Sequence, residues 1–161
     1  MTWQKSKSIT TYEEAREAAF AYLARRDHFR AELVSKLTAR GADASLAQQL
    51  GAELIERGYL DDSKTAEIWI RSRKRKYGPA RIREELRAKE VDSDLIATAL
   101  ARFYDEEEEK QILQKLLEQD LARYPSSPDE KERNRLLTRY AQRGFSPRLI
   151  LKTLNANTRQ T

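Results

Sequence analysis

Apolar residues recur every three or four positions along most of this chain, which is the spacing of an amphipathic helix. In the first such segment, Tyr12, Ala15 and Ala19 fall on one face. Thr11 and Glu14 stand three residues apart at its start, which is the arrangement of a capping box. This segment predicts a helix over residues 12–25, and the same periodicity continues as far as Leu154. The pattern indicates an all-α protein.

Short turns between the apolar series carry the residues that start and stop helices. An aspartate before an apolar series is predicted to cap the next helix, as at Asp27, Asp43, Asp62 and Asp92. Ser127 and Glu130 predict a further capping box. A glycine just past an apolar series is predicted to close a helix, as at Gly41, Gly58 and Gly144. These markers divide the chain into short helices.

One pattern of six positions ends the second helix of three successive segments. Its members are an apolar residue, a basic residue, a turn residue, an apolar residue, a cap and an apolar leucine. The first copy begins at Leu37, the second 49 residues later at Leu86, and the third 54 residues after that at Tyr140. Matching offsets of this kind predict tandem units that pack within themselves and against their neighbours.

The repeat predicts three tandem three-helix units, each helix-turn-helix-like, that form an elongated, curved rod. The units cover residues 11–60, 61–104 and 105–156, with an N-terminal extension at 1–10 and a C-terminal tail at 157–161. Glu90 departs from the pattern, because the other copies have glycine at the same turn position. Either this turn avoids the left-handed conformation, or Glu90 adopts it with mild strain.

Composition excludes several classes of protein. The chain of 161 residues is 39% apolar and 35% charged and has no cysteine, which rules out disulfides and thiolate metal sites. It lacks a signal-peptide pattern and any apolar run of about 18 residues, so we expect a cytoplasmic protein with no membrane contact.

Charge is concentrated in one stretch. Residues 71–91 hold nine Lys or Arg and three Glu, a net charge of +6, whereas the whole chain carries +5. Such a concentration indicates an anionic partner, although a solvated surface is the alternative. Arg83 and Arg87 stand four residues apart with no acid assigned to them, an unfavourable pair that suggests a binding role. The candidate contact residues are Arg71, Lys74, Arg75, Lys76, Arg81, Arg83 and Arg87.

Other chemistry has weaker support. The acidic run 105–109 is predicted to complement the positive end of a helix dipole rather than to bind a cation. His28, the one histidine, has no neighbouring nucleophile or paired acid and is predicted to lie at the surface or in a first helical turn. The sequence has no phosphate-binding loop, HExxH or GxSxG motif. We therefore expect no enzymatic activity, no metal and no cofactor.

Two stretches of the chain, GYLDDS at Gly58–Ser63 and YGPARIREEL at Tyr77–Leu86, resemble the RecX family, the regulators of the RecA recombinase. The resemblance extends over all three repeats, from about residue 18 to residue 154. Phe29 and Glu90 are departures, because the family usually has Ser and Gly at these positions. The motif positions that we assign to structure are Gly58, Tyr59, Leu60, Asp62, Tyr77, Gly78, Pro79 and Gly144.

The resemblance implies a regulatory protein without enzymatic activity. A member of the family is expected to bind the RecA nucleoprotein filament on single-stranded DNA and to inhibit RecA's ATPase, strand exchange and filament growth. It implies weaker binding to single-stranded and double-stranded DNA alone, and we expect a monomer.

The residues themselves leave one alternative open, a stand-alone helix-turn-helix-like DNA-binding module. The helix from Pro79 would then enter a DNA groove and place Arg83 and Arg87 on phosphates or guanine edges.

Overall fold

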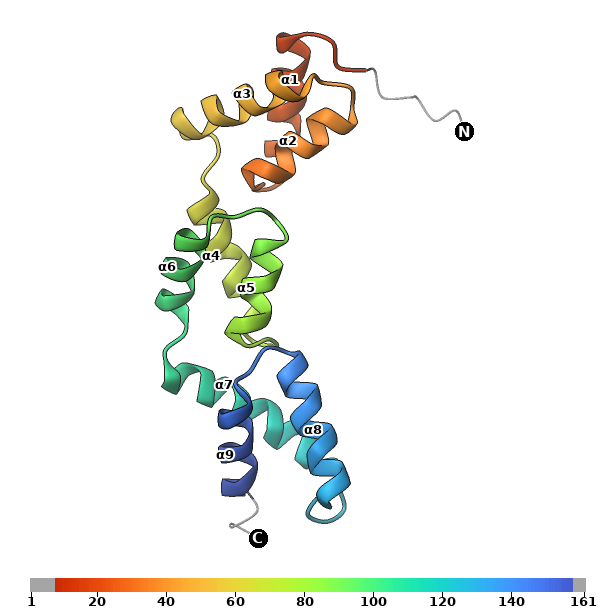
Figure 1. Ribbon diagram of the computed structural model, residues 1–161, viewed down its shortest axis with the longest axis vertical. Coiled ribbons are helices and arrows are strands. Elements are labelled where there is room, and N and C mark those ends of the chain that lie inside the picture. Colours follow the sequence, from red (N-terminus) through yellow and green to blue (C-terminus); the bar gives the residue numbers. More distant parts are fainter. Residues whose placement is uncertain (1–7, 158–161) are drawn as a thin grey trace, which may run out of the picture. The chain divides into compact units, whose positions relative to one another are not determined.

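The computed structural model describes residues 8–157, and within these residues it contains nine α-helices and no strand. This arrangement confirms the predicted all-α fold of helical repeats (Figure 1). The helices are α1 Tyr12–Leu23, α2 Arg30–Ala39, α3 Ala44–Glu56, α4 Asp62–Arg73, α5 Pro79–Arg87, α6 Ser93–Phe103, α7 Glu106–Leu121, α8 Glu130–Gln142 and α9 Pro147–Asn157. None of them is long and apolar enough to cross a membrane.

The chain divides into two compact units. Of the described residues, the first unit contains 8–65 and 89–91, and the second contains 66–88 and 92–157. The predicted repeat boundaries stay a prediction, and residues 1–7 of the extension and 158–161 of the tail lie outside the described part.

The turns after α2 and α8 have the predicted geometry. Gly41 and Gly144 have φ values of 99° and 89°, and Glu90 has a φ of 57°. The open question about Glu90 is thereby answered, because this non-glycine residue occupies the left-handed region at a cost of about 1–2 kcal/mol. The apolar residues that follow these turns, Ala42, Val91 and Phe145, are all buried. The six-position pattern therefore corresponds to one recurring helix-ending turn.

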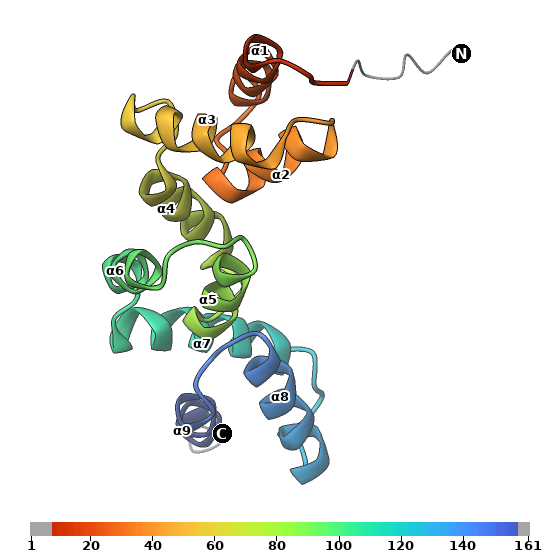
Figure 2. The ribbon, with the colours of Figure 1, turned by 45° about the horizontal axis from the view of Figure 1, so that its top comes forward.

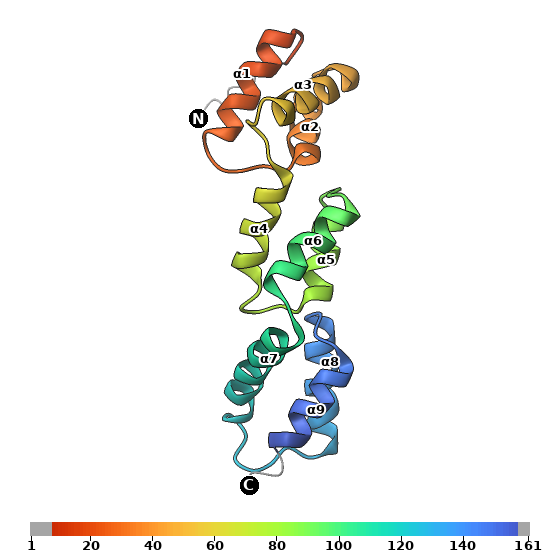
Figure 3. The ribbon, with the colours of Figure 1, turned by 90° about the vertical axis from the view of Figure 1, so that its left-hand side faces the viewer.

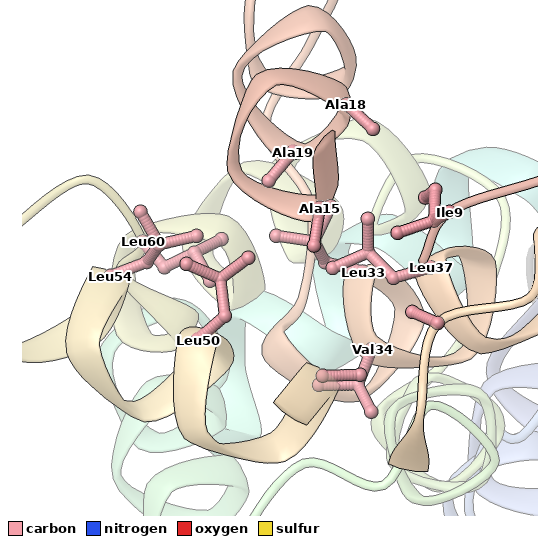
Figure 4. Close-up of a cluster of buried hydrophobic side chains, with 12 residues drawn as sticks. Ile9, Ala15, Ala18, Ala19, Leu33, Val34, Leu37, Leu50, Leu54 and Leu60 are labelled. Carbon is pink, nitrogen blue, oxygen red and sulfur yellow. The ribbon is translucent and has the colours of Figure 1, made fainter. Parts of the chain in front are cut away.

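Small and large apolar side chains form the core of the first unit. Ala15 and Ala19 on α1 are fully buried and allow close approach to Leu33 on α2 and Leu50 on α3 (Figure 4). Leu60, from the predicted motif, completes this cluster with an exposed fraction of 3%. Tyr59 beside it is 55% exposed and meets the ring of Phe20 edge-on at 4.9 Å.

Two predicted caps are wrong, and the same residue explains both. Asp27 does not cap α2, whose N-cap residue is Phe29 and has no side-chain capping bond. Asp62 does not cap its own helix, because the Asp61 carboxylate accepts the Lys64 N–H at 3.0 Å instead. The Asp62 carboxylate accepts the first N–H of α2, that of Arg30, at 2.8 Å. A tertiary contact therefore supplies the cap that Phe29 lacks.

The cap of α8 also differs from the prediction. Asp129 accepts the Glu132 N–H at 2.8 Å, and Glu132 accepts the Asp129 N–H at 2.9 Å. This reciprocal pair is a capping box, but it lies two residues beyond the predicted Ser127–Glu130 box. The predicted caps Asp43 and Asp92 are confirmed, since each accepts N–H groups of the next helix's first turn.

In the second unit, α7 lies beside α8 and α9 (Figures 2 and 3). Leu113 and Leu117 of α7 are fully buried against Leu136 of α8 and Ile150 of α9. The hydroxyl of Tyr140 donates to the Leu116 carbonyl or the Asp120 carboxylate, both at 2.9 Å. This bond satisfies a polar group inside an otherwise apolar core.

The turn that ends α8 packs on the start of α5. The Gly78 N–H donates to the Arg143 carbonyl at 2.8 Å, and the Ala80 N–H donates to the Gly144 carbonyl at 3.2 Å. Each glycine is required, because a Cβ on Gly78 would lie 2.3 Å from the Gly144 carbonyl oxygen, and one on Gly144 would lie 2.2 Å from the Arg81 nitrogen. The unpaired N–H groups of one helix are thus bound by the free carbonyls of another.

Candidate functional site

The basic segment 71–91 covers the end of α4, a short turn and all of α5. The Lys74 N–H donates to the Ile70 carbonyl at 2.8 Å and the Tyr77 N–H to the Arg73 carbonyl at 3.1 Å, which carries the helical bonding past the end of α4. Pro79 then starts α5, where a fixed φ and a missing N–H are suited to the first helical position.

Tyr104 fixes this turn against the end of α6. Its hydroxyl donates to the Tyr77 carbonyl at 2.7 Å. Burial raises the pKa of Tyr104 well above its usual value, and the carboxylates of Glu109 and Glu108 raise it further. The hydroxyl therefore stays protonated and can donate this bond throughout the physiological pH range.

Glu85 binds two side chains of the basic segment and that of Trp69, which lies just before the segment. Its carboxylate accepts from the Arg73 Nε at 3.0 Å, the Trp69 Nε1 at 3.0 Å and the Arg81 Nε at 3.4 Å. Arg81 and Glu85 stand at i,i+4, the spacing at which charges on one helix face meet. Arg73 also lies over the Trp69 and Tyr77 rings, at 5.0 and 5.3 Å from their centroids. Glu85 thus neutralises charge on both helices.

Two further candidate cations have acidic partners. Lys74 pairs with Glu108 of α7 at 2.5 Å, and Arg71 lies 3.9 Å from Glu67. The guanidinium of Arg71 also lies 5.2 Å from the centroid of the Phe103 ring.

Arg83 and Arg87 have different surroundings, although the sequence analysis expected both to lack an acidic partner. That expectation is wrong for Arg87, which pairs with Glu84, three residues earlier, at 2.8 Å. Arg83 has no ion pair with any described residue. Of the seven candidates, the cations without an ion pair among residues 8–157 are Arg75, Lys76 and Arg83.

Arg83 lines a groove together with two cations that the sequence analysis did not select. Arg148 and Lys152 of α9 face the same groove, whose volume is about 520 Å³. Figures 1 and 3 both show α6 and α9 on the same side of this unit. Arg148 and Lys152 are like charges four residues apart, which is the spacing that had selected Arg83 and Arg87. Neither has an ion pair in the described chain. Applied to the third repeat, that criterion would have found them.

The acidic run 105–109 occupies the first turn of α7, as predicted. Asp105 caps the helix by accepting the Glu108 N–H at 2.7 Å. Glu109 accepts the Ser146 N–H at 3.0 Å, which ties the start of α9 to α7. Within the described residues, no group of three or more His, Cys, Asp or Glu side chains is placed to bind a metal ion.

His28 is not a surface residue, contrary to the expectation. It is 2% exposed, its Nδ1 lies 2.9 Å from the Arg26 carbonyl, and its Nε2 lies 3.2 Å from the Lys36 ammonium. Burial lowers the pKa of His28, and the Lys36 and Arg26 charges act in the same direction. The side chain is therefore a neutral structural element: Nδ1 donates a hydrogen bond to the Arg26 carbonyl and Nε2 accepts one from the Lys36 ammonium.

Comparison with known proteins identifies the family. Residues 61–100 match the family model described as RecX, second three-helix domain. Regulatory protein RecX of Mycobacterium leprae (strain Br4923) is 33% identical over 147 residues, which cover 89% of this chain and 85% of that protein. Regulatory protein RecX of Halorhodospira halophila is 43% identical over 96 residues, or 59% of this chain and 60% of that protein. This second alignment thus spans less than two thirds of the relative.

Solved structures support the same fold. The crystal structure of RecX from Lactobacillus salivarius superposes with a TM-score of 0.79 at 22% identity, over 90% of this chain and 95% of that one. A second crystal structure, of a regulatory protein RecX, gives a TM-score of 0.76 at 22% identity and covers 86% of this chain and 68% of that one. The family assignment rests on the M. leprae relative, and the two crystal structures support the fold alone. This chain belongs to the RecX family of regulatory proteins.

Proposed function

We propose that this protein is a non-enzymatic regulator that binds the RecA filament on single-stranded DNA. In this role it inhibits RecA's ATPase, strand exchange and filament growth in the cytoplasm, and so modulates recombination and DNA repair. Membership of the RecX family supports the regulatory role. The observation that carries the contact surface is the group of cations without ion pairs, Arg75, Lys76 and Arg83, on the repeat that the family model matches.

Cations without an internal partner are the best suited to an external anion. Arg75 and Lys76 are exposed and Arg83 is half-buried, so they reach a partner without breaking a bond inside the protein. The other candidates would have to break or share an internal ion pair before they could bind a partner. These pairs are Arg71–Glu67, Arg81–Glu85 and Arg87–Glu84. A RecA filament on DNA offers acidic side chains and phosphates, both of which attract such cations.

A triple variant tests this surface. R75A/K76A/R83A removes three unpaired positive charges, and R71A/R81A/R87A removes three paired ones as a control of equal net charge. We expect the first to raise the concentration needed for half-inhibition of RecA's DNA-dependent ATPase by about tenfold or more, or about 1.4 kcal/mol. The control should change it by about threefold or less, because exposed ion pairs contribute little. Equal effects of the two variants would show that net charge alone matters.

The packing of α5 weighs against a stand-alone DNA-binding module. Helix-turn-helix proteins place the N-terminal residues of the recognition helix against base edges. Here Gly78 is buried, and the N-terminal N–H groups at Gly78 and Ala80 are bound by carbonyls of Arg143 and Gly144. Binding to bare single-stranded DNA and to RecA-coated DNA at the same salt concentration separates the two functions. Tighter binding to the bare strand, or to naked duplex, would favour the DNA-binding module.

A further inference from the structure

The groove in the second unit that contains Arg83 carries both signs of charge. Its cations are Arg83 of α5 and Arg148 and Lys152 of α9, and its carboxylates are Asp105, Glu106 and Glu109 at the start of α7. None of these cations forms an ion pair within 4 Å of a described carboxylate. The two sets of charges therefore share one groove of about 520 Å³ without neutralising each other.

The groove also has an apolar floor. Leu100 of α6 and Leu149 of α9 line it and are only 4% and 7% exposed. Two of the carboxylates already have structural tasks, since Asp105 caps α7 and Glu109 accepts the Ser146 N–H. Glu106 is exposed and has no such bond among the described residues. It is the acid most available to a ligand.

We infer that this groove binds a segment of a partner protein that carries an acidic and a basic side chain about one helical turn apart, with a small apolar residue between them. The inference rests on the proposed function and assigns this part of the surface to protein, rather than to DNA phosphate. The acidic side chain would meet Arg83, Arg148 or Lys152, and the basic one would meet Glu106. Side chains three or four residues apart on one helix have this spacing.

Charge complementarity favours a protein segment with both charges over the phosphate backbone of DNA as the ligand of this groove. A volume of about 520 Å³ corresponds to an edge of about 8 Å, which equals the Debye length at physiological salt. A phosphate attracted by Arg148 would thus remain within reach of the carboxylates, and their repulsion would offset part of the attraction. A protein segment with both charges is attracted by the cations and by the carboxylates of the groove.

The decisive variant is Glu106→Lys, because the two occupants predict opposite signs. If a mixed-charge protein segment binds, E106K weakens binding to RecA-coated single-stranded DNA by about tenfold. If DNA phosphate binds, the added positive charge strengthens it. Arg148→Glu should weaken binding in either case and shows that the groove is used.

Glu107→Lys is the matched control. Glu107 stands in the same first turn of α7 and does not line the groove, so E107K changes the net charge and the helix-dipole interaction by the same amount as E106K. E107K also breaks the exposed Glu107–Lys110 ion pair at 3.4 Å, which contributes little. We expect E107K to change binding by less than about twofold, and all three variants to retain the helicity and melting temperature of a folded protein within a few degrees.

Each outcome has a distinct meaning. If the unmodified protein does not bind the RecA-coated strand, the proposed function fails. If it binds and E106K leaves binding unchanged or tightens it, the protein-segment inference is wrong while the function stands. Equal weakening by E106K and E107K also overturns it. Analytical ultracentrifugation tests a second copy of this chain as the occupant, and a dimer that E106K disrupts would replace the inferred partner.

Discussion

The contact between Gly144 and the start of α5 makes a quantitative prediction about stability. Gly144→Ala adds a Cβ at a residue with a φ of 89°, where that atom would lie 2.2 Å from the Arg81 backbone nitrogen. Gly58→Ala is its matched control, because Gly58 has a φ of 74° and nothing lies within 4 Å of its added Cβ. The two variants share the backbone strain and differ in the steric conflict.

The structure gives the size of each effect. The left-handed conformation of an alanine costs about 1–2 kcal/mol, which is the whole loss expected for G58A. Relief of the 2.2 Å contact in G144A requires a displacement of about 1 Å, since ordinary contacts begin near 3.4 Å. That displacement breaks the Gly78 bond to Arg143 and the Ala80 bond to Gly144, now 2.8 and 3.2 Å long. At about 1 kcal/mol for each bond, G144A loses about 3–4 kcal/mol.

Urea denaturation followed by far-ultraviolet circular dichroism measures both values. In a Trp3→Phe background, Trp69 fluorescence gives a separate reading from the second unit, which contains both Trp69 and Gly144. We expect the unfolding free energy of G144A to fall about 2 kcal/mol further than that of G58A. Equal losses would refute the reasoning, because they would mean that the α8 turn does not need a glycine to approach α5.

Three further predictions follow from side-chain contacts. Asp62→Ala should cost about 1–2 kcal/mol by removing the acceptor of the Arg30 N–H, and Asp62→Asn, which keeps an oxygen, should cost less in the same denaturation assay. Burial lowers the pKa of His28, so the unfolded chain takes up a proton at a pH where the folded chain does not. The free energy of unfolding therefore decreases as the pH is lowered below about 6.5. His28→Gln should therefore flatten the loss of unfolding free energy between about pH 7 and 5, and an unchanged slope would contradict this account. Glu85→Ala should cost about 2–3 kcal/mol, because the charge-assisted bonds from Arg73 are lost. It should also shift Trp69 fluorescence in the folded state, because the Trp69 Nε1–H loses its acceptor. A melting temperature equal to that of the wild type would contradict this prediction.

Local features of the sequence were sufficient to predict the fold. Helix periodicity, the caps Asp43 and Asp92, and the turn residues Gly41 and Gly144 act within a few residues of their own position. Their effects can be read from spacing because the interactions close within one helical turn. The repeat register could be predicted for the same reason.

The candidate site was only partly predictable, because ion pairs depend on which helices meet. The i,i+4 spacing is sufficient to place Arg81 beside Glu85 on one helix, but spacing could not reveal that Lys74 meets Glu108, 34 residues away. It also gave no indication that Arg148 shares a groove with Arg83. The sequence identified where positive charge is concentrated, and tertiary contacts decided which of those charges remain without partners.

The two departures at Phe29 and Glu90 show the same division. Sequence alone predicted that a turn follows Leu86, because the repeat pattern is local. Only the structure decided that Glu90 takes a φ of 57° there, since packing in the native fold can impose a strained conformation. Likewise, Phe29 cannot cap α2, and the missing acceptor is Asp62, which is distant in sequence. Short-range bonds determined the helices, and the packing between helices determined how their ends and charges are satisfied.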